Sequence, residues 1–344
     1  MFIDHGHFQY NSVALGFLIF STGFLIRGNS LLSAVCFTLS FLFKQTFLYF
    51  APLFFAIMLG EALKLPTYPE SARRVILLGL VVLATVTTVL CPISMHCGSV
   101  ECTGFQLASL LRRVFPFHRR IFEDYVANVW VALSPMFRLR YASDSTLQLA
   151  RYASLCFTIC GFFECCWVVV RYPSKQVVAV SLGATSMSFY LFSWMVHEKA
   201  ILLPLTAVLC GIPTISRTGH FWTIPRLFEA ALISLWHLVR VEQSEAGVLG
   251  IAGFAMVLVY VVQSSLLAAN SRKYCLNSVC IAANVCAFSG AVLQAFAPSP
   301  ARFPHIWVLW TCLGCLATFL IIWRQLVCIV SQCCIHDFGK LKQL

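Results

Sequence analysis

Long apolar blocks separated by short polar stretches run along the whole chain. A helix that crosses a bilayer needs about 20 predominantly apolar residues, and most of the blocks approach that length. Strands of a transmembrane barrel would instead form short segments of alternating polarity, which this sequence lacks. The pattern therefore predicts an all-α polytopic membrane protein. About 11 spans are expected, and they cover 12–26, 30–43, 45–60, 75–93, 147–170, 176–195, 199–212, 220–238, 247–268, 279–297 and 306–330.

The stretch 30–60 has two interpretations, one long helix or two short helices that meet at Lys44 and Gln45. Basic residues favour the cytoplasmic side of a membrane protein, so charge separates the two interpretations. With two helices, Arg27 and the later basic segments fall on one side; these segments are EALKLPTYPESARR, RYPSK, SRTG, SRKY and GKLKQL. The ending KLKQL also resembles an endoplasmic-reticulum retrieval signal, which acts in the cytosol. We therefore expect two helices and a cytosolic C-terminus.

Composition supports the same class, because charged residues form 11% of the 344 residues and hydrophobic residues 60%. A soluble domain carries about 25% charged residues. The net charge of +11 does not indicate nucleic acid, since Lys and Arg gather in cytoplasmic loops and beside lipid phosphates. The P-loop, G-x-S-x-G and H-E-x-x-H motifs are all missing from the sequence.

Most of the 17 cysteines lie inside apolar runs, where a free thiol behaves as a small hydrophobe. The adjacent pairs at 165–166 and 333–334 lack the partner spacing of a zinc site. Cys91, Cys97 and Cys102 instead flank a polar loop. A disulfide at this loop would pair Cys102 with either of the other two.

Polar stretches gather on the opposite, luminal side; they are DHGHFQYN, FKQ, the loop 94–146 and VHEK. VHEK contains His197, Glu198 and Lys199 between two apolar runs. Ionisable groups next to a bilayer are costly and are functional candidates by default. The His and Lys would bind a phosphate, and the Glu would orient them. The alternative is a short luminal turn whose charges are hydrated.

The loop 94–146 carries arginines on the luminal side, against the usual bias. Arginine matches phosphate oxygens bidentately, so this basic cluster indicates phosphate binding. Its segment FPFHRRIFEDYVAN mixes aromatic and charged residues and predicts luminal interfacial helices, either catalytic or purely structural. Asp4, His5 and His7 would coordinate a metal, bind phosphate or cap the first helix.

Four motifs resemble segments of one family and occur in the same order as in that family. They are IDHGHFQYN, FKQTFLYFAPLFF, RVFPFHRRIFEDYVANVW and LFSWMVHEKAILLPL. They resemble the endoplasmic-reticulum glucosyltransferases that use dolichyl-phosphate glucose in N-glycosylation, from Ile3 to about Leu205. The segments FKQ and FEDYVANVW are similar to the corresponding segments of the branch that adds the first glucose. The resemblance implies a hexosyltransferase with a multispanning GT-C helical bundle and a luminal active site. It also implies that neither a metal nor another cofactor is needed. It implies that glucose is transferred from dolichyl-phosphate glucose, with inversion, to form an α-1,3 linkage on dolichyl-pyrophosphate-linked Man9GlcNAc2. Membrane lipid is expected as a partner, and nucleic acid is not.

Other functions remain open at this point. The chain could belong to the branch that adds the second glucose, or be a catalytically inactive relative that binds lipid-linked sugars. A transporter is a more distant alternative, since polar clusters at span ends also line translocation paths. Against a transporter, ionisable residues are few in the middle of the spans.

The resemblance also assigns the candidate residues. Contacts to the donor phosphate are expected from His197, Lys199, Arg119 and Arg120. The substrate pocket is expected to include Asp4, His5, His7, Gln9, Lys44, Gln45, Glu123, Asp124, Asn128 and Glu198.

The sequence departs from the family pattern in several places. The family has an acidic luminal loop that supplies the general base, so we expect that base upstream of Met1 and an N-terminally truncated chain. Tyr125 stands where the family usually has Lys, and 118–120 replaces a smaller Ala-Arg-Gly-like stretch. We expect one transmembrane domain, 1–344, in which 1–212 holds the family module with site loops at 1–11, 94–146 and 196–199. Residues 213–344 are expected to form divergent C-terminal helices and a cytosolic tail.

Overall fold

The computed structural model describes residues 11–97, 99–114, 126–137, 139–194, 196–241 and 271–341. Within these ranges the chain is helical and has no β-strand, which confirms the predicted fold class. The described part has five helices that are long and apolar enough to cross a membrane; they are Gln45–Ala62, Tyr68–Cys97, Asp144–Arg171, Cys275–Phe296 and Ile306–Ile335. The chain divides into two compact units, a first unit through Ile121 and a second unit from Phe122. The predicted span 247–268 lies outside the described residues.

The first unit begins with a helical hairpin. Its elements are α2 (Asn11–Ile26), α3 (Ser30–Phe43), the 3-10 helix η1 (Gln45–Phe50), α4 (Ala51–Ala62), α5 (Tyr68–Cys97) and α6 (Val100–Val114). The turn between α2 and α3 needs Gly28, whose φ of 84° lies in the left-handed region. Ser21 Oγ donates to the Ser33 carbonyl at 2.8 Å, and Ser40 Oγ donates to the Ala14 carbonyl at 2.8 Å. Such small polar residues let two membrane helices approach and bond.

The stretch 30–60 is broken where the charge pattern predicted. α3 ends at Phe43, Lys44 is extended with φ −149° and ψ 120°, and η1 follows. Pro52 in the first turn of α4 accounts for the later change from η1 to α4, because in a continuous α-helix its ring would clash with the carbonyl of Leu48. The prediction of two segments is confirmed.

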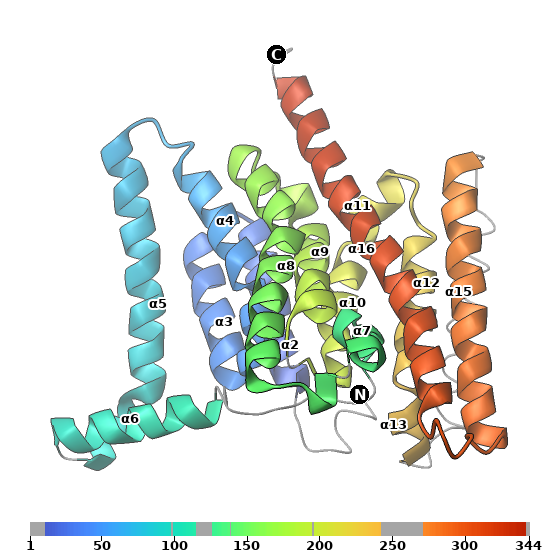
Figure 1. The fold of residues 1–344 in the computed structure, drawn as a ribbon. Helices are drawn as coiled ribbons and strands as arrows, with labels where there is room; N and C mark the ends of the chain where they lie inside the picture. Colours follow the sequence, from blue (N-terminus) through green and yellow to red (C-terminus); the bar gives the residue numbers. More distant parts are fainter. Residues whose placement is uncertain are drawn as a thin grey trace. The chain divides into compact units, whose positions relative to one another are not determined.

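The long polar loop begins later than predicted. α5 continues through Pro92 to Cys97, so the loop starts after residue 97 and not at 94. α6 then lies across the end of α5 (Figure 1). It carries Arg112 and Arg113 in its last turn, exposes Phe105 and Leu111, and buries none of its residues. This amphipathic composition is typical of an interfacial helix. The segment FPFHRRIFEDYVAN, from which interfacial helices were predicted, lies outside the described residues up to 125.

The second unit is built around α9. Its elements are α7 (Val129–Phe137), η2 (Leu139–Tyr141), α8 (Asp144–Arg171), η3 (Lys175–Val177), α9 (Val178–Phe192), η4 (Glu198–Ile201), α10 (Leu202–Cys210), α11 (Ile212–Arg217), α12 (Thr223–Ser234), α13 (Trp236–Val241), α15 (Ser271–Phe296) and α16 (Ile306–Leu341). α9 packs against α8, α10 and α16 and is buried along nearly its whole length (Figure 1). Its residues are apolar or small on every side, as a central helix requires. A Cβ at Gly183 would lie 2.7 Å from Val208 Cγ2, so α9 and α10 are in close contact.

Three predicted spans of this unit differ from the observed helices. The block 199–212 starts as a 3-10 turn and ends at Cys210, and the block 220–238 divides at Leu235 into α12 and α13. α8 begins at Asp144 because Ser143 caps it; the Ser143 Oγ accepts from the Thr146 N–H at 3.4 Å.

A buried polar network joins α12, α15 and α16. Arg226 Nη1 donates to both carboxylate oxygens of Glu229 at 2.6 Å. Asn284 Nδ2 donates to Glu229 Oε2 at 2.9 Å, and Thr318 Oγ1 donates to Asn284 Oδ1 at 2.7 Å. In a membrane such bonds take the place of water, so the network fixes the three helices together.

Two basic linkers lie together at one end of the second unit. Thr214 Oγ1 donates to the Gln176 carbonyl at 2.5 Å, which brings the basic linkers 171–175 and 216–219 to one end. α9 runs from that end to Phe192, so His197–Lys199 lie at the other end. This separation agrees with the sides that the sequence predicted for these segments.

Candidate functional site

The first candidate segment is the turn between α9 and α10. α9 stops at Phe192, and Ser193 is extended, with φ −77° and ψ 155°. His197 is also extended, and its carbonyl accepts from the Ala200 N–H at 2.9 Å to begin η4. The turn thus projects three consecutive ionisable side chains from a short, backbone-bonded link between two buried helices.

These three side chains differ in exposure. His197 is exposed, Glu198 is half-buried and Lys199 is only 9% exposed. None of the three lacks polar or electrostatic contacts. Glu198 lies within electrostatic range of the Tyr190 hydroxyl on α9 and the Cys312 thiol on α16. Lys199 therefore places its amine, largely buried, beside an exposed imidazole. A buried ammonium is costly unless polar or charged partners compensate it.

The α9 end of this turn is held by side chains that the sequence analysis did not single out. Trp130 Nε1 donates to the Phe192 carbonyl at 2.7 Å, and Ser154 Oγ donates to the same oxygen at 2.8 Å. The rings of Trp130 and Trp194 meet edge to face with centroids 5.7 Å apart. Trp130 stands inside the motif VANVW, whose aromatic residue could have been noted as an anchor. The contact of Trp130 with Phe192 could not be predicted from their spacing in the sequence.

Asn128, a predicted pocket residue, caps α7 in this structure. Its Oδ1 accepts from the Val131 N–H at 2.9 Å, and its carbonyl accepts from the Ala132 N–H at 3.3 Å. The side chain is 5% exposed. Asn128 therefore positions α7, the helix that carries Trp130 to the end of α9. A contact between Asn128 and substrate stays a prediction.

In the first unit, Lys44 closes the polar end of the α2–α3 hairpin. Its Nζ donates to Asn11 Oδ1, and Asn11 is buried. Lys44 itself is half-buried, and the neighbouring Gln45 is exposed. Asn11 belongs to the motif IDHGHFQYN, although we had not assigned it to the pocket. Lys44 and Gln45 lie in the first unit, whereas Asn128 and His197–Lys199 lie in the second.

The remaining predicted residues lie outside the described ranges; they are Asp4, His5, His7, Gln9, Arg119, Arg120, Glu123 and Asp124. Within the ranges that are described, no group of three or more His, Cys, Asp or Glu side chains could hold a metal ion.

All 17 cysteines are free thiols in this structure. The Cys97 and Cys102 thiols hydrogen-bond across the corner between α5 and α6, and this bond is the main cause that raises the pKa of the Cys102 thiol. Of the two partners considered for Cys102, the structure therefore brings Cys97 into contact.

Comparison with known proteins adds the family. The ALG6, ALG8 glycosyltransferase family matches residues 1–325. The "Dolichyl pyrophosphate Man9GlcNAc2 alpha-1,3-glucosyltransferase" of Saccharomyces cerevisiae (strain ATCC 204508 / S288c) is 36% identical over 244 residues, which are 70% of this chain and 42% of that protein. The "Probable dolichyl pyrophosphate Man9GlcNAc2 alpha-1,3-glucosyltransferase" of Schizosaccharomyces pombe (strain 972 / ATCC 24843) is 33% identical over 316 residues, 90% of this chain and 58% of that protein.

A relative from Pongo abelii, "Dolichyl pyrophosphate Man9GlcNAc2 alpha-1,3-glucosyltransferase", is 34% identical over 238 residues, 67% of this chain and 45% of that protein. The chain spans about half the length of the curated relatives it matches. The family match continues past residue 212, beyond the motifs that first suggested the resemblance. Together with its membrane-length helices, this match shows that the chain belongs to the ALG6, ALG8 glycosyltransferase family.

Proposed function

We propose that this chain transfers glucose from dolichyl-phosphate glucose to dolichyl-pyrophosphate-linked Man9GlcNAc2, forming an α-1,3 linkage with inversion at the sugar. Three relatives at 33–36% identity carry Man9GlcNAc2 and α-1,3-glucosyltransferase in their names, which favours the first-glucose acceptor. The observation that carries the proposal is the turn at 197–199, where an exposed His stands beside a half-buried Glu and a buried Lys.

The chemistry of the reaction suits such a turn. Dolichyl phosphate leaves as an anion, so fixed positive charge and N–H donors aid its departure more than a proton donor would. His197 is exposed and donates an N–H to a phosphate oxygen. Lys199 adds positive potential from a buried position, where charge is less screened than in water. Glu198 orients the pair.

The acceptor hydroxyl must lose a proton to a positioned base. We assign that base to none of the described residues. Among the other candidates, Arg119 and Arg120 would add donors to the phosphate, and the remaining pocket residues, with Lys44, Gln45 and Asn128 among them, would surround the two sugars.

The proposal includes an orientation in the endoplasmic-reticulum membrane. His197–Lys199 would face the lumen, where the oligosaccharide is, and the C-terminus would lie in the cytosol. The basic linkers at the opposite end of the second unit support this orientation, because basic loops favour the cytosol.

The test is a transfer assay in microsomes from cells that lack the first glucosyltransferase and express this chain. The substrates are dolichyl-phosphate glucose and dolichyl-pyrophosphate-linked Man9GlcNAc2. Mass spectrometry measures the mass of the product. Wild type should add one glucose, and Lys199→Gln should lower the rate by about a hundredfold. Lys175→Gln, at an exposed lysine of the basic end, is the matched control. A wild type that adds no glucose to this acceptor contradicts the proposal.

A further inference from the structure

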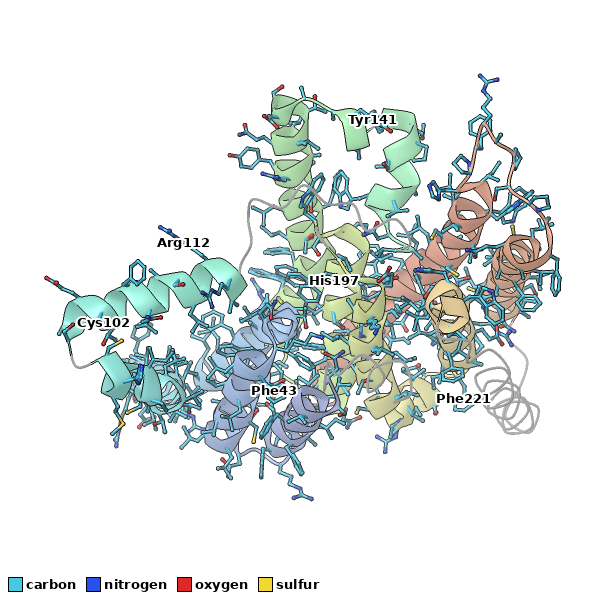
Figure 2. All side chains as sticks on the ribbon, turned by 90° about the horizontal axis from the view of Figure 1, so that it is seen from below. Phe43, Cys102, Arg112, Tyr141, His197 and Phe221 are labelled. Carbon is cyan, nitrogen blue, oxygen red and sulfur yellow. The ribbon has the colours of Figure 1, made fainter. Side chains whose placement is uncertain are left out.

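A second candidate site lies at the same end of the second unit as the turn at 197–199. It is an open cavity of about 610 Å³ lined by residues of α7, η2, the loop 297–305 and the first turn of α16. Its walls are mainly apolar and include Val131, Pro135, Phe303 and Leu309. The three residues of the 197–199 turn do not line it. Figure 2 views this end of the unit, with Tyr141 of η2 and His197 labelled.

Two basic side chains, Arg302 and His305, stand at this cavity. Both are exposed, and Arg302 lies over the Phe303 ring at 5.6 Å from its centroid. Neither makes an ion pair with a carboxylate of the described chain. Arginine binds phosphate oxygens through two parallel N–H groups, and a histidine ring N–H donates to the same oxygens. A cavity with apolar walls and these N–H donors at its edge suits an amphiphile with an anionic head.

The positions of Arg302 and His305 in the chain indicate how deep in the membrane the site lies. They come directly before Ile306, where the candidate span Ile306–Ile335 begins. Residues at the start of a span lie where the hydrocarbon region meets the lipid headgroups. A phosphate at this level would meet Arg302 and His305, while a lipid chain attached to it would run along the apolar walls.

The loop that carries Arg302 and His305 is held in place. It contains Pro298, Pro300 and Pro304, and the Phe303 N–H donates to the Pro300 carbonyl at 2.8 Å. The helices on either side pack closely, since a Cβ at Gly314 would lie 2.8 Å from the Ala283 carbonyl. A site that is already ordered loses less entropy when its ligand binds.

We propose that this cavity binds the pyrophosphate and the first isoprene units of the lipid that carries the oligosaccharide acceptor. The inference rests on the proposed function, because transfer between two lipid-linked substrates needs two anion sites on one face of the membrane. The turn at 197–199 takes the donor phosphate, and the cavity takes the acceptor.

Kinetics separate the acceptor site from the donor site. Arg302→Gln and His305→Gln should each raise the KM for the lipid-linked Man9GlcNAc2 about tenfold, the effect of losing one charge-assisted hydrogen bond. The KM for dolichyl-phosphate glucose should stay within about twofold of wild type. Arg217→Gln, at an exposed arginine of the opposite end, is the matched control. A rise in the donor KM instead of the acceptor KM overturns the assignment.

Binding gives a readout that does not depend on catalysis. Native mass spectrometry of the purified chain with dolichyl pyrophosphate, dolichyl phosphate or phosphatidic acid compares the three lipids directly. Arg302→Gln should reduce the bound dolichyl pyrophosphate about tenfold relative to wild type and leave the other two lipids unchanged. Equal loss of phosphatidic acid would make the cavity a general phospholipid site and overturn the proposal. If the chain binds dolichyl pyrophosphate through Arg302 but transfers no glucose, the proposed function fails while the binding site stands.

Discussion

The indole of Trp130 donates a 2.7 Å hydrogen bond to the carbonyl of Phe192, and this bond joins α7 to the end of α9. The Phe192 carbonyl lies at the last residue of its helix, where carbonyls lack a partner within the helix. Ser154 bonds the same oxygen from α8. Three helices therefore meet at one atom, five residues before His197. The candidate turn takes its position from this junction.

The first prediction tests that junction. Trp130→Phe keeps most of the ring but removes its N–H, and it should destabilise the chain by about 1 kcal/mol. Without this bond the turn at 197–199 is held less firmly, which should lower the glucose transfer rate by about tenfold. Trp167→Phe, at an exposed tryptophan of α8, is the control. Thermal unfolding and the transfer assay measure the two effects, and equal behaviour of the two variants would contradict the anchoring role of Trp130.

Substitutions at Asn128 distinguish its role as the cap of α7 from a contact with substrate. Asn128→Ala should cost about 1 kcal/mol of stability, because the Val131 N–H loses its acceptor. Asn128→Ser keeps a capping oxygen and should restore both stability and transfer. Should Asn128→Ser restore the unfolding temperature but not the transfer rate, Asn128 also contacts a sugar.

The Cys97–Cys102 contact predicts a pH-dependent reactivity. The hydrogen bond raises the pKa of the Cys102 thiol, so less of it is thiolate in mildly alkaline buffer than in an isolated thiol. Cys97→Ala removes the bond, lowers this pKa and should speed alkylation of Cys102. Mass spectrometry of the alkylated peptide at about pH 8 measures the rate. Cys91→Ala is the control, and a faster rate in that variant instead would show that Cys91 is the partner.

The network of Glu229 and Asn284 predicts a strong effect on stability. Asn284→Ala removes one of the two hydrogen bonds to Glu229 Oε2 and leaves Thr318 Oγ1 without its acceptor, which should cost about 2–3 kcal/mol. Asn277→Ala, at a half-buried asparagine two turns earlier on α15, is the comparison. The unfolding midpoint in detergent measures both, and similar midpoints would contradict a structural role for the network.

The sequence predicted the helical class and the break at Lys44 because both leave a local signal. A run of about 20 apolar residues is long enough to span a bilayer, and the charge bias of the linkers decided between one helix and two. The end of α5 was placed too early, since polar residues after Pro92 resemble a loop although the helix continues to Cys97. The division of α12 from α13 at Leu235 has neither a proline nor a glycine to mark it.

The candidate site was predictable only in part. His197, Glu198 and Lys199 could be selected because charges between apolar runs are unusual. Their supports could not, since Trp130 lies 62 residues from Phe192 in the chain and only the packing of α7 on α9 joins them. The cavity at Arg302 was missed for the same reason. Its walls come from segments that are about 160 residues apart along the chain, and a sequence pattern reports only neighbours.

The most direct test of the account is the lipid-linked oligosaccharide of cells that lack the first glucosyltransferase and express this chain. The measurement is the mass of the oligosaccharide released from its lipid, for wild type and for Lys199→Gln at equal protein levels. The account predicts one added hexose with wild type and unmodified Man9GlcNAc2 with the variant. The same added hexose in both, or in neither, would contradict it.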